Sequence, residues 1–448
     1  MADEFRVERD TMGEMRVPAN ALYGAQTQRA VENFPISRLR LQRAFLKALG
    51  QIKACAARVN SHLGYLDAER AKAIEEAAVQ VASGAHDDQF VVDVFQTGSG
   101  TSTNMNANEV IAHLAKAHPN DHVNLGQSSN DVIPTAIHVA AAMLVHDELL
   151  PAMYALEQSL LKKSFEFHDV IKIGRTHLQD AVPMRLGQEF GGYATQIRRS
   201  IERIEAAMPG LFELALGGTA VGTGLNALPG FAGATIEMLS EITHLPFREA
   251  KNHFEAQGGK DAVCFLSGAL KSYAVSLTKI ANDIRWLGSG PRCGLGELKV
   301  PATQPGSSIM PGKVNPVIAE SLLMICAQVI GHDATITWCA AAGNMELNVM
   351  MPVMAYDLLE SIELLAAGSR NFQVRCIDGL EADADRAGAF VEQSLAMATV
   401  LAPVLGYEKA AELAKKAYAS GKTIREVARG VLPEEKLNEL LDPKTQAG

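Results

Sequence analysis

The chain has 448 residues, of which 48% are hydrophobic and 21% charged, and its 41 basic and 51 acidic side chains give a formal net charge of −10. This composition excludes a wholly disordered or fibrous protein, and the acidity argues against nucleic acid or an anionic membrane as a partner. The length exceeds one typical domain of roughly 150 residues, so two or three packed units are expected. Because no uninterrupted apolar run approaches the roughly 18 residues that span a bilayer, and the amino terminus lacks the apolar segment of a signal peptide, we expect a soluble, cytoplasmic protein.

Residues 1–133 are predicted to form a mixed, mostly helical N-terminal domain with minor β-structure. Two stretches in it, Thr97–Asn108 and Gln127–Asp131, are rich in Gly, Ser, Thr and Asn and are predicted to be ordered loops. Their hydroxyls and amides can bind a carboxylate without adding charge. Either stretch taken singly is equally compatible with a loop that only caps a helix.

Residues 134–362 are predicted to form a central bundle of long helices. Proline disrupts helix interiors, and residues 247–290 contain none. Within this segment, apolar residues recur at alternating spacings of three and four, which is typical of a bundle helix; they are Val263, Leu266, Leu270, Tyr273, Leu277, Ile280, Ile284 and Leu287. Segments 135–168, 184–206 and 317–342 are the candidate neighbours of this helix.

Residues 363–448 complete the chain as a small helical C-terminal domain. Strands are expected to be minor, because alternation of β-branched residues is scarce. The predicted fold class is therefore all-α, with three domains.

The sequence contains none of the common nucleotide or metal motifs. Five residues separate Gly306 from Gly312, and Val314 replaces the hydroxyl that a phosphate-binding loop requires. There is no HExxH pair, and the six cysteines form no CxxC pair. We therefore predict no metal and no cofactor, and we expect buried thiols at Cys55, Cys264, Cys293, Cys326, Cys339 and Cys376.

The segment 306–316, GSSIMPGKVNP, predicts an anion site. Asn315 followed by Pro316 is typical of a helix start, where free amides and the positive end of the helix dipole would lie near Lys313. The Gly-Ser-Ser sequence ahead of it can move and close over a bound anion as a lid. A plain loop that leads into a bundle helix is the alternative.

The segment 174–180, GRTHLQD, is predicted to end one helix before the chain turns at Pro183. His177 titrates near neutrality, so it is a candidate proton carrier if a carboxylate such as Glu320 orients it. A purely structural histidine is the alternative.

Together, TGSGTSTNMN, GQSSND, GRTHLQD and GSSIMPGKVNP resemble the motifs of the class II fumarases in the fumarase/aspartase superfamily. The resemblance extends essentially end to end, through HDDQF, LGGTAVGTGLN and KIANDIRWLGSGP.

The nearest rival within the superfamily is aspartate ammonia-lyase. Aspartate ammonia-lyases typically have Gln, Thr and Ala at the positions that His177, Ser129 and Gly312 occupy here, so these three positions favour fumarase. His122 points the other way, because fumarases commonly have Asp at that position. A helical scaffold that has lost catalysis is a third possibility, against which the intact residues Ser307, His177, Lys313 and Glu320 argue.

The resemblance implies reversible trans addition of water to fumarate, giving L-malate in the tricarboxylic acid cycle through an aci-carboxylate intermediate. It implies a homotetramer in which three subunits contribute to each active site. Ser307 would be the base at carbon, and His177, paired with Glu320, would handle the water. The substrate carboxylates would be bound by Ser99, Gly100, Thr101, Ser128, Ser129, Asn130, Thr176, Ser308, Lys313, Val314 and Asn315.

The resemblance also implies a second anion site at His118, Pro119, Asn120 and Asp121. The chain departs from the family pattern here, because Ala115 stands where an arginine is common and the preceding segment is shortened.

Overall fold

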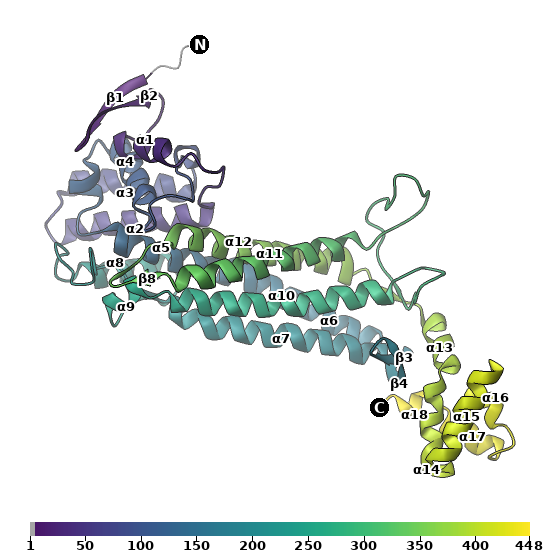
Figure 1. Cartoon of the computed structure of the whole chain (residues 1–448). Helices are drawn as coiled ribbons and strands as arrows, with labels where there is room; N and C mark the ends of the chain where they lie inside the picture. Colours follow the sequence, from purple (N-terminus) through teal and green to yellow (C-terminus); the bar gives the residue numbers. More distant parts are fainter. Residues whose placement is uncertain (1–4) are drawn as a thin grey trace. The chain divides into compact units, whose positions relative to one another are not determined.

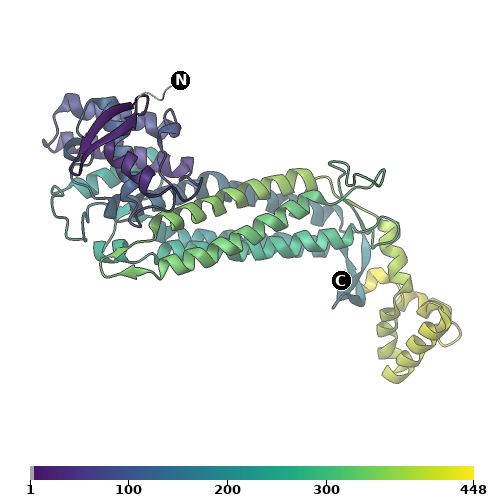
Figure 2. The ribbon, with the colours of Figure 1, turned by 45° about the horizontal axis from the view of Figure 1, so that its top comes forward.

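The computed structural model describes residues 5–448 (Figures 1 and 2). The fold is mainly helical with a few short strands, as predicted. The chain forms two compact units: unit 1 lies within Met1–Pro151, Ile201–Ala274 and Cys326–Ala366, and unit 2 comprises Ala152–Ser200, Val275–Ile325 and Ala367–Gly448. The boundaries at 133/134 and 362/363 lie inside helices, and the division into three domains stays a prediction.

Unit 1 begins with a hairpin and continues with helices. Its elements before the first long helix are β1 (Phe5–Asp10), β2 (Gly13–Pro18), α1 (Ala25–Asn33), α2 (Arg43–His62), α3 (Ala68–Ser83), the 3-10 turn η1 (Asp87–Gln89), α4 (Thr101–Ala115), the π-helical turn η2 (Pro119–Val123), α5 (Ser129–Leu144) and the π-helical turn η3 (Val145–Leu149). Later elements of this unit are β5 (Glu213–Leu214), α8 (Phe231–Thr243), β6 (Arg248–Glu249), α9 (His253–Gly258), β8 (Gly343–Asn344) and β9 (Leu347–Asn348).

Unit 2 contains a second hairpin and the carboxy-terminal helices. Its elements are β3 (Ile171–Thr176), β4 (Gln179–Arg185), β7 (Leu298–Lys299), η4 (Gln373–Ile377), β10 (Glu381–Ala382), α13 (Ala384–Gln393), η5 (Leu395–Leu401), α14 (Ala402–Leu405), α15 (Tyr407–Ser420), α16 (Ile424–Ala428), α17 (Glu434–Leu440) and α18 (Pro443–Gln446).

Five longer helices belong partly to each unit and run alongside one another in both views (Figures 1 and 2). They are α6 (Leu150–Glu166), α7 (Leu186–Leu211), α10 (Asp261–Leu287), α11 (Val317–Ala340) and α12 (Met351–Phe372). The predicted neighbours of the 263–287 helix are thus helical, and α12 is a further long helix that was not among the predicted neighbours.

The described sheets all have two strands. The pairs β1–β2, β3–β4, β7–β10 and β8–β9 are antiparallel, and β5–β6 is parallel. Strands are therefore minor, but they are not confined to the N-terminal region where they were expected.

The periodicity of α10 correctly predicts its buried face. All eight apolar positions predicted from Val263 to Leu287 are at most 5% exposed. On its polar side, Lys279 and the hydroxyl of Tyr193 both donate to Asp283 within unit 2. Spacing alone could place these residues because a straight helix presents every third or fourth residue to the same side.

Two findings bear on the expectations about the chain as a whole, and the expectation about the cysteines is wrong in part. The helical stretches Ser129–Glu166 and Val317–Ala340 are long and apolar enough to cross a membrane by length and composition. Neither stretch is an uninterrupted apolar run, because charged residues such as Asp147, Glu148 and Glu320 interrupt them. Among the six cysteines, four are buried, but Cys264 is half-buried and Cys293 is exposed.

Candidate active site

A first cluster of hydrogen-bond donors, the hydroxyls of Ser99, Thr101 and Ser129, lies in unit 1 where α4 and α5 begin. The hydroxyl of Thr101 is 2.8 Å from that of Ser99 and 2.7 Å from that of Ser129. The predicted loops are therefore largely helical: Thr101 starts α4 and Ser129 starts α5. Because helix amino ends carry free N–H groups and a positive partial charge, this arrangement suits a carboxylate.

The capping role that the sequence left open belongs to Ser128. Its hydroxyl accepts from the Asn130 amide at 3.2 Å, and its own amide donates to Asp131 at 2.9 Å, forming a capping box. The second Asp131 oxygen accepts the amides of Gly217 and Thr219, both at 3.0 Å. Burial raises the pKa of Asp131. This buried carboxylate thus joins the start of α5 to the loop near 217, while the Asn130 side chain donates to the Ala220 carbonyl.

Two glycines let the first donor loop approach its neighbours closely. Gly98 accepts the Met351 amide at 3.0 Å, and a Cβ added to Gly98 would lie 1.7 Å from the Val349 carbonyl oxygen. Gly100, a predicted substrate-binding residue, has a φ of +74°, and a Cβ there would meet Ile133 at 2.9 Å. Glycine is required at both positions for space or for conformation.

Replacing Gly98 by alanine is expected to displace the donor loop, because backbone atoms rather than a flexible side chain occupy the space. We expect a loss of about 1–3 kcal/mol in the free energy of unfolding, as for overpacked cores, and a higher KM. Denaturant unfolding and steady-state kinetics measure both quantities. Gly192→Ala is the matched control, since its Cβ would meet nothing within 4 Å; unchanged stability and KM in Gly98→Ala would contradict the expectation.

In unit 2, Thr176 and His177 lie at a hairpin, and the prediction that this segment ends a helix is wrong. In the antiparallel pair of β3 and β4, Ile171 lies opposite Arg185 at one end and Thr176 lies opposite Gln179 at the other. His177 and Leu178 therefore form a two-residue turn. Their φ values are 57° and 59°, the left-handed conformation that such hairpin turns require. Thr176, His177 and Leu178 are exposed. Gly and Asn usually occupy such turns, so the sequence signal for this hairpin was weak.

Replacing His177 by asparagine is expected to lower kcat by roughly 100-fold with little change in KM, because it would remove the predicted proton carrier and leave the predicted binding groups in place. Asparagine tolerates the left-handed conformation, so the hairpin should keep its shape. Leu178→Asn, in the same turn, is the matched control. A change confined to KM would make His177 a binding residue instead.

The segment 306–316 forms a closed loop in unit 2. The amide of Gly306 donates to the Lys313 carbonyl at 2.7 Å, and the Asn315 side chain donates to the Gly306 carbonyl at 2.7 Å. The hydroxyl oxygen of Ser307 accepts the amides of Ile309 and Met310 at 3.2 and 3.0 Å. Ser307 thus has the backbone donors that would stabilise an alkoxide.

The predicted lid residues Ser308, Lys313 and Val314 are exposed. Gly312 has a φ of +77°, which an alanine would adopt only at a cost of roughly 1 kcal/mol. The helix predicted to begin at Asn315–Pro316 begins at Val317, and Glu320 lies in its first turn. Between His177 and Glu320 of one chain, the described structure contains neither a hydrogen bond nor an ion pair.

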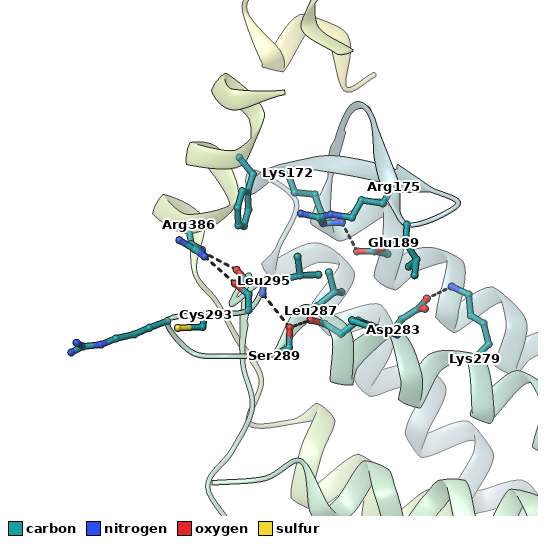
Figure 3. A pocket seen from close by; sticks show the side chains of 15 residues that line it. Lys172, Arg175, Glu189, Lys279, Asp283, Leu287, Ser289, Cys293, Leu295 and Arg386 are labelled. Carbon is teal, nitrogen blue, oxygen red and sulfur yellow. Dashed lines mark hydrogen bonds and ion pairs between the residues drawn. The ribbon is translucent and has the colours of Figure 1, made fainter. Parts of the chain in front are cut away.

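A buried charge cluster fixes the hairpin that carries His177. Arg175, two residues before His177, donates two hydrogen bonds to Glu297, at 3.0 and 2.9 Å, and Glu297 is fully buried. Lys172 lies 3.6 Å from Glu297 and 3.3 Å from Glu189. Beside the cluster is a cavity of about 760 Å³, where Arg386 donates to the carbonyls of the segment 294–295 (Figure 3). Glu297 immediately precedes β7, and the chain runs on from β7 to Ser307. The charge cluster therefore connects the hairpin that carries His177 to the start of the segment that leads to Ser307.

The predicted second anion site lies at η2 in unit 1. The Nδ1 atom of His118 accepts the Asp121 amide at 3.1 Å and lies 3.2 Å from the Asp121 carboxylate, and the His118 amide donates to the His122 ring at 2.9 Å. Arg70, on α3, lies 3.2 Å from the other nitrogen of His122, and burial together with Arg70 lowers the His122 pKa. A cavity of about 550 Å³ is lined by Asn120, Asp121, residues 124–128 and four residues of the loop 219–226. Within residues 5–448, no group of three or more His, Cys, Asp or Glu side chains could hold a metal ion.

Two family models match the chain: one described as "Lyase" over residues 13–331, and one described as "Fumarase C C-terminus" over residues 397–445. Together with the fold, these matches define a lyase of the fumarase type.

Curated relatives and solved structures narrow this class. Fumarate hydratase class II of Corynebacterium glutamicum is 55% identical over 444 residues, covering 97% of this chain and 94% of its own length. That of Mycobacterium tuberculosis is 54% identical over 446 residues, covering 98% and 94%. The class II fumarase of Schistosoma mansoni superposes with a TM-score of 0.96 at 41% identity over 99% of each chain. A fumarate lyase:delta crystallin of Brucella melitensis, bound to cobalt, gives 0.94 at 45% identity over 99% of this chain and 100% of that one. The chain belongs to the class II fumarases, which confirms the resemblance found in its motifs.

Proposed function

We propose that this chain catalyses the reversible hydration of fumarate to L-malate, by trans addition of water, as an enzyme of the tricarboxylic acid cycle. The observation that carries the proposal is identity of 50–55% with class II fumarate hydratases along nearly the whole chain. The donor groups at the starts of α4 and α5 and the Ser307 loop support it, because a dicarboxylate needs donors and its carbon needs a base.

The hard step is removal of a proton from the carbon next to a carboxylate, because negative charge then builds up on that carboxylate. Preorganised donors must stabilise the resulting aci-carboxylate. Lys313 and Asn315, close to the start of α11, are suited to this role. We assign Ser307 as the base, since two backbone amides donate to its hydroxyl oxygen and would favour its alkoxide, as would the charge of Lys313 in the same loop.

His177 is assigned to the water that adds or leaves, so acid and base act on opposite faces of the substrate. Its partner would be Glu320. Because one chain shows no contact between them, this pairing requires Glu320 of another copy. In line with the family resemblance, the active site is proposed to draw on three subunits of a homotetramer, and no metal or cofactor is proposed.

Exposed apolar side chains on the long helices support the homotetramer. Phe265, Met324 and Trp338 are 60%, 68% and 74% exposed in the single chain. Large apolar side chains of this kind on helices favour burial against further copies. Such a bundle also accounts for the two apolar stretches in a cytoplasmic enzyme. Sedimentation at several protein concentrations tests the tetramer, and a monomer at micromolar concentration would contradict it.

The activity is tested by following the loss of fumarate absorbance, with and without a chelator, and the formation of fumarate from L-malate or L-aspartate. Turnover of fumarate and L-malate that survives the chelator is the expected result. If the enzyme forms fumarate from L-aspartate but not from L-malate, the aspartate ammonia-lyase alternative is favoured. His122, which replaces the Asp common in fumarases, is the residue that favours this alternative. No turnover of any of the three would favour the scaffold that has lost catalysis.

A further inference from the structure

Lys53 is a buried cation to which the proposed mechanism gives no role. It lies on α2, is fully buried, and donates from Nζ to Asn124 Oδ1 and Gln127 Oε1, both at 3.0 Å. Within residues 5–448, Lys53 has no ion pair within 4 Å. Burying an ammonium that has only neutral partners is unfavourable for the free energy of folding, so we expect Lys53 to have a role in the function of the protein.

The hydrogen bonds of Lys53 extend to α4. Asn124 Oδ1 also accepts from the side-chain amides of Asn104 and Asn108, each at 3.2 Å. Asn104 lies one turn after Thr101, where α4 begins. The same oxygen that receives the Lys53 ammonium therefore holds the first part of α4.

The hydrogen bonds also extend to α5. The side-chain amide of Gln127 donates to the backbone carbonyls of Val123 and Leu125. The backbone carbonyl of Gln127 accepts from the Asn124 side chain at 3.1 Å. The segment 123–127 is thus folded around the ammonium of Lys53, and the next residue, Ser128, caps α5. The helices α2, α4 and α5 are labelled in Figure 1.

On the basis of the function proposed above, we propose that Lys53 is a positioning residue for substrate binding. Its ammonium holds Asn124 and Gln127, and through them it keeps the amino ends of α4 and α5 in the arrangement that receives a substrate carboxylate. The donors positioned in this way are Ser99, Thr101 and Ser129. Lys53 touches no reacting atom, so its effect is on binding and not on proton transfer.

The charge of Lys53 adds a pH dependence. Burial lowers the pKa of Lys53 to about 7, while Asp131 on α5 acts in the opposite direction. The groups that α4 and the segment 123–127 contribute to this hydrogen-bond network are uncharged amides, and Asp131 is the charged group that acts on Lys53. The ammonium is therefore charged below about pH 7 and neutral above it, so the KM for fumarate should rise as the pH increases through this value.

The test replaces Lys53 by methionine, which has a similar length and no charge. The expected result is a KM for fumarate about tenfold higher or more, with kcat within roughly threefold of wild type and without the rise of KM above pH 7. Lys163→Met is the matched control: Lys163 is 5% exposed in unit 2 and donates to Glu166 and the Leu380 carbonyl, so its loss should leave KM unchanged. A folded Lys53→Met enzyme with wild-type KM, or with a loss confined to kcat, would overturn the proposal.

If Lys53→Met does not fold, Gln127→Met decides, because it removes one acceptor and keeps the lysine. A raised KM in this variant supports the positioning role, and an unchanged KM overturns it. Calorimetry with succinate, an unreactive dicarboxylate, separates this inference from the proposed function. If the wild type turns over no fumarate, the function fails, whereas weaker succinate binding in the variants still supports the role of Lys53 and equal binding refutes it.

Discussion

The enzyme with Ser307 replaced by alanine is expected to lose roughly 1,000-fold in kcat for fumarate hydration, within the range found when a general base is removed. The hydroxyl oxygen of Ser307 is the one side-chain oxygen of its loop shown to accept two backbone amides, those of Ile309 and Met310. Without this hydroxyl, the proposed base is missing, and no other group at this position would take the proton from carbon. The change should leave the fold intact, because the loop from Gly306 to Asn315 is closed by other hydrogen bonds.

Steady-state kinetics in both directions, with thermal unfolding alongside, test this expectation. Thr303→Ala is the matched control, because Thr303 is exposed in the preceding segment and carries no proposed role. Ser308→Ala should mainly raise KM, since Ser308 is assigned to binding. Wild-type kcat in Ser307→Ala would refute the assignment of Ser307 as the base.

Replacing Glu297 by alanine is expected to lower the free energy of unfolding by about 3–5 kcal/mol, the usual result of removing one partner of a buried ion pair. The side chain is fully buried and accepts two hydrogen bonds from Arg175, with Lys172 3.6 Å away. Its loss leaves Arg175 without its two hydrogen bonds. Lys172, which is 1% exposed, would then have Glu189, 3.3 Å away, as its remaining ion-pair partner among residues 5–448. Since Arg175 lies two residues before His177, kcat should fall together with stability.

Denaturant unfolding and kinetics of the folded fraction measure these two effects. Glu297→Gln keeps the shape of the side chain and should restore part of the stability through a neutral hydrogen bond. Glu412→Ala removes one partner of an exposed pair with Lys409, so it should leave the unfolding midpoint unchanged. Equal stability of Glu297→Ala and wild type would show that the cluster does not hold the hairpin.

Much of the helical architecture could be predicted because long helices follow from local rules. The eight apolar positions of α10 are buried as predicted, since one face of a regular helix is determined by spacing. The same rules failed at the hairpin of His177 and Leu178, which occupy a left-handed turn without Gly or Asn. They also failed for Thr101–Asn108, where Ser, Thr and Asn suggest a loop, but the segment is helical and its residues from Thr103 onward are buried. Tertiary packing outweighs such weak propensities.

The motifs by themselves determined the family and the candidate residues, because chemically unusual segments such as GSSIMPGKVNP place the proposed anion site and the proposed base in a few adjacent positions. Only the tertiary structure placed Thr101 against Ser129, Arg175 on Glu297 and Lys53 between Asn124 and Gln127. These partners are 28 to 122 residues apart, and no periodicity relates them. A lysine in an apolar helix gives no sign of its partners, because the cost of its burial and the amides that offset it arise only when α2, α4 and α5 pack together.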